Sequence, residues 1–343
     1  MYVMRVKHLW LLLLMLTAVA CSDDTKSEQI APPEELVYYN VSLCMGGEIS
    51  VEDEPLTRGT ATNDIYGINV FVDTNGDGNI TDHYAYGLFD NKQDMTISLL
   101  SGYKYKFECS LVKNGKNTLY YGQAFNNAYS GFAAPFMNTS TKSTMIGNEF
   151  ILGTTYLDLA GSDAHIAGTT PTTSNAATQS PNINRFYGIL EEFVPTQDGV
   201  ATIYLKRMVF GAKLIINGVV DGTVTVSGLW GDLNKTVTED YEGQAIIYTV
   251  PSVTDCLASE SEYTFSKTLS LKYDSNRGDA WDLSNSLDVT FKRNILTTIT
   301  INVSPDLASG DISLTEEEMG DDNVIDLEIN TNGVIDTPVN PTE

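Results

Sequence analysis

The chain has few cysteines, few histidines and a shortage of basic residues. Its 343 residues include 4 Cys and 3 His, and 20 Lys and Arg stand against 45 Asp and Glu, which gives a formal net charge of −25. Nucleic-acid binding needs a basic surface, so this balance argues against that class of protein. Strong acidity is typical of a solvated, self-repelling surface and names no partner by itself.

The four cysteines, Cys21, Cys44, Cys109 and Cys256, form no CxxC pair. If Cys21 carries lipid, three thiols remain and at most one disulfide forms. Cys44 and Cys109 lie in runs of alternating apolar residues, so we expect both to be small buried hydrophobic side chains. The fold is therefore expected to depend on burial rather than on disulfide bonds.

Signatures of catalysis are also missing. Beyond the N-terminal segment the histidines are His83 and His165, and the sequence has no zinc motif, phosphate-binding Gly-rich loop or GxSxG elbow. Glu191 and Glu192 are adjacent, so on a strand they would point to opposite faces and would not form a glycosidase carboxylate pair. The sequence predicts that the chain is not an enzyme and needs no cofactor.

A long apolar run occurs at the N-terminus, where Arg5 and Lys7 precede residues 9–16 and small residues lead into Cys21. This pattern is typical of a signal peptide over residues 1–20, and its apolar part is too short to span a bilayer. A cysteine at the cleavage position resembles a bacterial lipobox, in which the thiol carries acyl groups such as palmitate. The alternative is a plain signal peptide followed by a chance cysteine. We predict lipidation at Cys21.

Residues 21–35 are rich in Asp, Glu, Ser and Pro, and we interpret them as a lipidated tether. Ser22-Asp23-Asp24 resembles the acidic export signal of lipoproteins that reach the outside of the Bacteroidales outer membrane. Several acyl chains would make this anchor durable. The predicted location is the cell surface, at the outer membrane.

The dominant pattern after the tether has a period of two. Apolar residues alternate with polar ones over residues 37–45, 103–111, 287–291 and 299–303. Successive side chains of a strand point to opposite faces, so these segments are predicted to be half-buried strands. Turn pairs separate the strands: Asn75-Gly76, Asp77-Gly78, Asn114-Gly115, Asn217-Gly218 and Asp221-Gly222. The sequence predicts an all-β fold of sandwich type, with any short helix confined to a loop, for example near Glu316–Met319.

Residues 138–184 are rich in Thr, Ser, Asn, Ala and Gly, and we expect them to form long loops that bury little apolar surface. Strong alternation resumes after Phe186. We therefore predict an N-terminal domain over residues 36–190 and a C-terminal domain over residues 191–343.

Several segments, in this order, resemble the fimbrillins, the type V pilins of Bacteroidales. After the lipobox and a first strand come Thr57-Arg58-Gly59, then Ile68–Asp73 running into Asn75-Gly76, Leu99–Tyr105, Leu205–Lys213 and Phe291–Asn294. Each motif alone is weak, whereas their order is moderately specific. The resemblance spans most of the mature chain, and residues 113–185 carry little of it.

This resemblance implies two transthyretin-like, Greek-key β-sandwich domains in tandem and a pilus subunit exported as a lipoprotein. An Arg-specific protease cuts such subunits after an arginine and releases the first strand, and a strand from a neighbouring subunit fills the groove. The implied partners are other pilin subunits, the protease and the outer membrane. The implied role is adhesion or biofilm formation, and stalk, anchor and tip positions in the pilus all stay open.

On this hypothesis residues 37–45 are the strand that leaves, Arg58 is the cleavage residue, and Ile325, Leu327 and Ile329 belong to the donor strand. The simpler alternatives are that Arg58 is an ordinary loop residue and that residues 324–330 form an internal strand of their own domain.

Asp73, Asn75, Asp77 and Gly78 match the first positions of a calcium-binding loop. The match then fails, because the twelfth position is Tyr84 instead of a bidentate acid and Asp82 stands at the tenth. We favour a β-hairpin tip here and keep calcium as the lesser alternative.

Aromatic content suggests a second class of function. Tyr is abundant and Trp stands at positions 10, 230 and 281, and exposed aromatic rings on β-sandwiches stack against sugars. Core packing is the simpler explanation for these rings. A monomeric glycan-binding surface lipoprotein is therefore the alternative to a pilin.

Overall fold

Strands make up most of the protein. The computed structural model describes residues 36–49, 63–122, 130–161, 183–260, 262–276, 280–304 and 309–319. The predicted all-β class is confirmed, and the helices of the described residues are short: η1 (Lys92–Asp94), α1 (Gly115–Thr118), η2 (Gly231–Leu233) and α2 (Val253–Ala258). None of the helices in these ranges is both long and apolar enough to cross a membrane.

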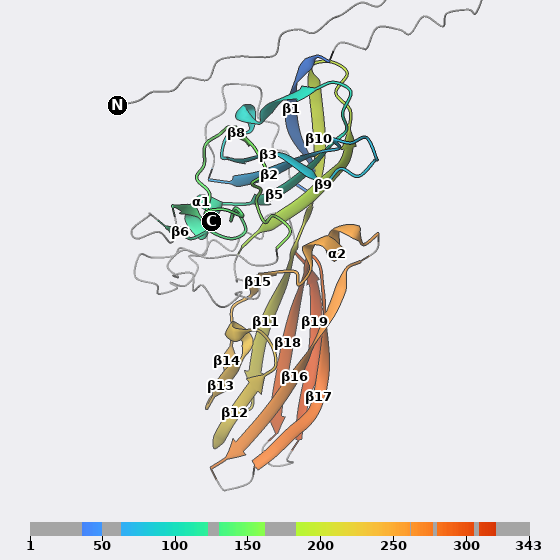
Figure 1. Ribbon diagram of the computed structural model, residues 1–343. Coiled ribbons are helices and arrows are strands. Elements are labelled where there is room, and N and C mark those ends of the chain that lie inside the picture. The colour runs from blue at the N-terminus through green and yellow to red at the C-terminus, as the bar shows by residue number, and fades with distance from the viewer. Residues whose placement is uncertain are drawn as a thin grey trace, which may run out of the picture. The chain divides into compact units, whose positions relative to one another are not determined.

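The N-terminal half, which we define as residues 36–207, contains a sheet in the order β4-β1-β10-β9-β5-β2-β3-β8 (Figure 1). Its strands are β1 (Tyr38–Gly47), β2 (Ile65–Val72), β3 (Asp82–Phe89), β4 (Thr96–Leu100), β5 (Tyr105–Val112), β8 (Phe150–Leu152), β9 (Arg185–Phe193) and β10 (Gly199–Arg207). A separate pair is formed by β6 (Tyr121–Gly122) and β7 (Gly131–Phe132).

Strand β10 joins two layers of this sheet. Its residues 199–205 pair with β1, and its last two residues, Lys206 and Arg207, pair with β9. Apolar side chains from both layers meet in one core, to which β1 contributes Val41 and Leu43 and β2 contributes Ile68. The N-terminal half is thus a sandwich whose β4-β1-β10 layer packs on the layer that contains β2.

The other face of β2 is covered as well. Leu157, Leu159 and Phe136 are buried against it, and a Cβ atom on Gly67 would lie 2.7 Å from the Phe136 ring. The expectation of little apolar burial after residue 138 is therefore wrong for this stretch. The few apolar residues of this stretch, such as Leu157 and Leu159, are spaced so that they pack on this second face of the sheet.

The C-terminal half, residues 209–319, contains two further sheets. One has the order β14-β11-β18-β19, with β15 also paired to β11, and the other has the order β13-β12-β16-β17. The bounds are β11 (Val209–Asn217), β12 (Gly222–Ser227), β13 (Lys235–Val237), β14 (Tyr241–Glu242), β15 (Ile246–Thr249), β16 (Thr264–Ser275), β17 (Ala280–Lys292), β18 (Ile295–Ser304) and β19 (Ser309–Glu318).

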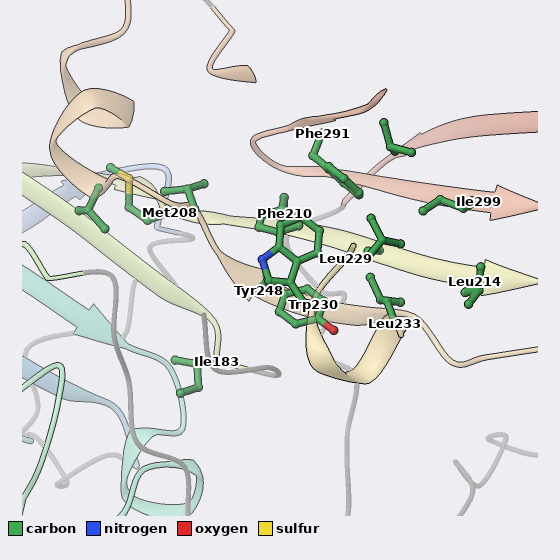
Figure 2. Packing of buried hydrophobic residues seen from close by; sticks show 14 of the residues in the cluster. Ile183, Met208, Phe210, Leu214, Leu229, Trp230, Leu233, Tyr248, Phe291 and Ile299 are labelled. Carbon is green, nitrogen blue, oxygen red and sulfur yellow. The ribbon is translucent and has the colours of Figure 1, made fainter. Parts of the chain in front are cut away.

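Aromatic rings fill the core at one end of this half. Figure 2 shows Phe210, Trp230, Tyr248 and Phe291 gathered together, and the Trp230 ring centroid lies 4.9 Å from Phe210 and 4.8 Å from Phe291. Aromatic pairs at such tilted geometries pack favourably. Trp230 is therefore a core residue.

The structure can be compared with several predictions made from the sequence. The turns at Asn217-Gly218 and Asp221-Gly222 fall between β11 and β12, as predicted, and Glu316–Met319 contains the end of β19 instead of a helix. The described residues from Leu36 onward form one compact unit, so the division into two domains stays a prediction, as does the transthyretin-like type. The chain passes from the first sheet to the next at Met208.

The described cysteines are free thiols. Cys109 and Cys256 are buried, whereas Cys44 is exposed, so the expectation that Cys44 is buried is wrong. Val41 and Leu43 occupy the inward positions of β1, and Cys44 has the opposite parity, which places it on the outer face.

Candidate functional site

The N-terminal strand β1 is inserted between two strands that come much later in the chain. It pairs in parallel with β10, with Val41 opposite Gly199 and Gly47 opposite Leu205. On its other side it pairs antiparallel with β4, with Tyr38 opposite Leu100. We call the space between β4 and β10 the β1 slot.

The inward side chains of β1 fill the core of the N-terminal half. Val41 is 0% exposed and Leu43 is 4% exposed, while the alternate residues Ser42 and Cys44 face outward. Full burial of an aliphatic side chain of this size is worth about 1.5–3 kcal/mol. A slot emptied of β1 would therefore expose apolar core surface as well as two strand edges.

Polar contacts hold the first part of β1 in register. The Asn40 N–H donates to Asp198 Oδ1 at 2.8 Å, and Ser98 Oγ donates to Asn40 Oδ1 at 2.8 Å. Val37 and Ser101 exchange two further bonds, since Val37 N donates to Ser101 Oγ and Ser101 N donates to Val37 O. The side chains of Asp198, Ser98 and Ser101, on or beside the strands that flank β1, take part in these contacts. They fix the register of β1 against β4 and β10.

The end of β1 is fixed by a turn and by a charged contact. Gly47 has φ +96°, and a Cβ atom there would lie 2.4 Å from the Leu205 carbonyl oxygen, so this close approach favours glycine. Glu48 then donates its N–H to Leu205 O at 2.9 Å. Its Oε2 accepts from the Arg207 N–H at 2.9 Å and from Arg293 Nη1 at 2.7 Å.

Beyond Ile49 the chain continues through residues 50–62, which lie outside the described residues, and is described again from Asn63, just before β2. Arg58 belongs to this connecting segment. A single cut there would leave β1 attached to the rest of the protein by non-covalent contacts alone. Geometry of this kind suits exchange of one strand for another.

The predicted calcium ligands lie in the turn between β2 and β3. Asp73 Oδ1 accepts from Gly76 N at 2.8 Å, and Asp73 Oδ2 accepts from Gly78 N at 2.9 Å. Asp77 Oδ1 accepts from Asn79 N at 2.7 Å, and hydrogen bonds from Asn79, with one from the Asn75 side chain, hold the pKa of Asp77 below its usual value.

Asn75 Oδ1 accepts from the Asp77 N–H, and Asp82 accepts from the Thr74 hydroxyl. The turn thus uses oxygens of all four predicted ligands itself. No group of three or more His, Cys, Asp or Glu suited to a metal is found in the part of the chain that the structure describes. The donor set matches the hairpin tip that we favour, and calcium binding stays an untested alternative.

A buried polar network, which the sequence did not reveal, holds residues 157–161 on β2. Asn69 Nδ2 donates to Leu157 O and to Glu108 Oε2, both at 2.8 Å, and Tyr187 donates to Glu108 Oε1 at 2.5 Å. Arg185 donates to the carbonyl oxygens of Leu159 and Gly161. Burial raises the pKa of Glu108 and, with the nearby Glu108 charge, that of Tyr187. The network is a structural clamp.

The remaining predicted site residues, Cys21, Arg58, Ile325, Leu327 and Ile329, lie outside the described residues. The structure instead adds Glu48, Arg207 and Arg293, which sequence reasoning missed. Glu48 follows the predicted first strand, residues 37–45, and lies outside its alternating pattern. A single acidic residue after a strand gives no indication in the sequence that it contacts Arg293, which lies far along the chain.

Neither the protein-family models nor the curated proteins contain a match to this sequence. Among solved structures, the chain is similar to a fimbrial assembly protein from Parabacteroides distasonis, at 13% identity and TM-score 0.33, over 83% of this chain and 97% of that one. It is also similar to two Porphyromonas gingivalis proteins.

These are the fimbrial anchor protein Mfa2 (10% identity, TM-score 0.30, 82% of this chain and 98% of that one) and the tip fimbrial protein Mfa3 (10%, 0.27, 82% and 99%). The neighbours include fimbrial proteins, the class that the sequence resembles, as well as putative cell adhesion proteins and putative polysaccharide binding proteins.

Proposed function

We propose that this chain is a fimbrial subunit of the fimbrillin type that polymerises by exchange of β1 for a strand of a neighbouring subunit. It is exported as a lipoprotein through Cys21 and faces the medium at the outer membrane. Cleavage after Arg58 by an Arg-specific protease frees β1. The assembled fimbria serves adhesion or biofilm formation.

The position of β1 carries this proposal. β1 is the first strand of the chain to be described, yet it lies between β4 and β10 and supplies Val41 and Leu43 to the core. It is joined to β2 by residues 50–62, where Arg58 lies. A cut in this segment therefore removes the covalent link between β1 and β2 without breaking any other strand connection.

Refilling the slot supplies the driving force for assembly. An empty slot would expose the edges of β4 and β10 and the core surface that Val41 and Leu43 now cover, at about 1.5–3 kcal/mol for each side chain. An incoming strand recovers this burial and the backbone hydrogen bonds. The candidate donor is the C-terminal segment that contains Ile325, Leu327 and Ile329, whose apolar residues alternate as those of β1 do.

The direct test compares the parent chain with Arg58→Ala and Arg58→Lys after treatment with an Arg-specific protease. We expect one cut in the parent, at Arg58, followed by oligomers that survive SDS without boiling. Both variants should stay uncut and monomeric, since neither supplies an arginine. Mass analysis of the fragments and an unboiled gel measure the two steps separately.

Polymers of Arg58→Ala as abundant as those of the parent would contradict cleavage as the trigger. A parent chain that is cut but stays monomeric would contradict strand exchange, and would favour a pilus anchor subunit or the glycan-binding alternative. Leu327→Asp tests the donor strand separately: we expect a folded, cleavable monomer that does not assemble. Normal polymer yield from Leu327→Asp would remove the C-terminal segment as donor.

A further inference from the structure

Glu48 links the end of β1 to the C-terminal half of the protein. One of its carboxylate oxygens, Oε2, accepts hydrogen bonds from the Arg207 N–H at 2.9 Å and from Arg293 Nη1 at 2.7 Å. Arg293 lies in the turn between β17 and β18, far along the chain from β1. The carboxylate therefore contacts both the last residue of β10 and a residue of the other half.

The residues that receive this carboxylate are held in place by groups that do not belong to β1. Arg207 is 3% exposed, and its guanidinium donates from Nε to Asn184 Oδ1 at 2.8 Å and from Nη1 to Asn294 Oδ1 at 3.0 Å. Arg293 Nη1 also donates to Arg207 O at 3.2 Å. We call Arg207 and Arg293, with these supports, the arginine seat.

Loss of β1 would remove the acid but leave the seat. Glu48 lies before residues 50–62, so it departs with β1 when that segment is cut. Arg293 has a side chain only 23% exposed, and a partly buried cation that loses its acid is unfavourable. The Arg207 N–H and Arg293 Nη1 would then remain as two oriented donors, and Arg293 carries a positive charge. Such a site favours a carboxylate over a neutral group.

We propose that the arginine seat makes the β1 slot selective for an incoming strand that carries a carboxylate at the position of Glu48. This inference rests on the proposed function, since it supposes that the slot is refilled. The occupant is an extended segment of another subunit that runs parallel to β10. Its pattern is that of β1: two apolar residues at alternate positions, as at Val41 and Leu43, with the acid five residues after the second. The C-terminal segment of this chain has Asn332 five residues after Leu327 and Val334 five residues after Ile329, so as a donor it would fill the slot without engaging the seat.

Such a strand would do more than fill the core. Its acid would again contact both Arg207 at the end of β10 and Arg293 in the β17–β18 turn, so that both halves of the subunit contact the incoming strand. A strand with the same apolar residues and no acid would fill the slot without this contact. The seat thus separates strands of equal apolar content by charge.

The test uses the full chain with a specific protease site placed within residues 50–62, so that it does not depend on Arg58. After cutting, the released segment is exchanged for one of two fluorescent peptides. One peptide has the sequence of residues 37–49, and the other carries Glu48→Gln. The dissociation rate of each peptide is measured from the cut parent chain, from cut Arg293→Gln and from cut Lys292→Gln, in low and high salt.

We expect the parent peptide to leave the parent chain about 5–10-fold more slowly than the Glu48→Gln peptide, as for a positioned charge pair. The ratio should shrink in high salt, because salt screens the pair. It should fall to about 1 in Arg293→Gln, which removes the charge of the seat. Lys292→Gln is the matched control and should keep the ratio, since Lys292 pairs with Glu316 and Glu262 and not with Glu48.

Equal dissociation of the two peptides from the parent chain would overturn the arginine seat while leaving strand exchange intact. A ratio that persists in Arg293→Gln would also overturn it, because the selectivity would then arise elsewhere. Failure of both peptides to bind a chain that has lost β1 would instead contradict the proposed function, and the inference with it.

Discussion

In the N-terminal half, β1 lies between the antiparallel β4 and the parallel β10; in the C-terminal half, β11 lies between the antiparallel β15 and the parallel β18. The second layers match as well, with the orders β3-β2-β5-β9 and β13-β12-β16-β17. The same strand topology therefore occurs twice along the chain, and β1 and β11 are equivalent positions.

The two first strands differ in how they are attached. β11 follows β10 after one residue, Met208, which is 0% exposed, so β11 cannot leave without disrupting the junction of the halves. β1 is joined to β2 through residues 50–62. Strands at equivalent positions thus differ in their covalent connection, and under the proposed strand exchange a single cut makes only β1 removable.

The largest expected change in the free energy of unfolding comes from replacing one inward leucine by alanine in each of the equivalent strands β1 and β11. Leu43→Ala in β1 and Leu214→Ala in β11 should each lower the free energy of unfolding of the intact chain by about 2–5 kcal/mol, since both side chains are buried. In the cut monomer that has lost β1, Leu43→Ala should have no effect and Leu214→Ala should keep its full cost.

Urea unfolding of the intact and cut chains measures both values. If Leu43→Ala still destabilises the cut monomer after the N-terminal fragment has been removed from solution, β1 has not left the slot and the comparison fails.

The next effect concerns the outer faces of two equivalent strands, β5 and β16. Residues 157–161 are held over β2 and β5 by Asn69, which bonds to Leu157 O and to Glu108 of β5, whereas Thr268 on β16 is exposed. Glu108→Ala should cost about 1–3 kcal/mol, because it leaves the Asn69 amide and the Tyr187 hydroxyl without this buried acceptor. Thr268→Ala should stay within about 0.5 kcal/mol, as surface substitutions do. Similar losses in thermal unfolding of the two variants would refute the clamp.

The clamp should also give the N-terminal half a pH dependence. Burial raises the pKa of Glu108, so its contribution to stability is present below its ordinary value and is lost as the pH rises through the raised pKa. The free energy of unfolding of the parent, relative to Glu108→Gln, should therefore fall as the pH rises through this window. A difference that is constant with pH would contradict the assignment.

The smallest expected effect is chemical. Cys44 is exposed on β1, whereas Cys109 and Cys256 are buried, and burial raises the pKa of the Cys256 thiol to about 11. Among these three thiols, a thiol reagent should label Cys44 of the folded, intact chain first, with little effect on stability. After cleavage the label should depart with the N-terminal fragment. A label on Cys109 or Cys256 at a comparable rate would show that their burial is incomplete.

The strands and their turns could be predicted because a half-buried strand repeats every two residues, as Val41 and Leu43 do, and because pairs such as Asn217-Gly218 favour turns. The same parity, applied to Cys44, would have placed it outside. Residue contacts of long range could not be predicted. Neither the pairing of β1 with β10 nor the meeting of Glu48 with Arg293 has a local signature, because the fold brings together residues that are distant in sequence.

The clamp was missed for a similar reason. Leu157 and Leu159 lie in a stretch whose overall composition is polar, and composition averages over the few residues that pack. Asn69 and Glu108 each look like ordinary polar residues of an alternating strand, and only the fold shows that their face of the sheet is covered.

Hydrogen exchange of the chain before and after cleavage within residues 50–62 tests the central claim most directly. The account predicts that the fragment containing β1 is lost and that the amides of β4 and β10 then exchange faster in the monomer, while the equivalent strands β15 and β18 keep their protection. Unchanged protection of β4 and β10 after the fragment has left would show that β1 does not hold the slot, and would contradict strand exchange at this position.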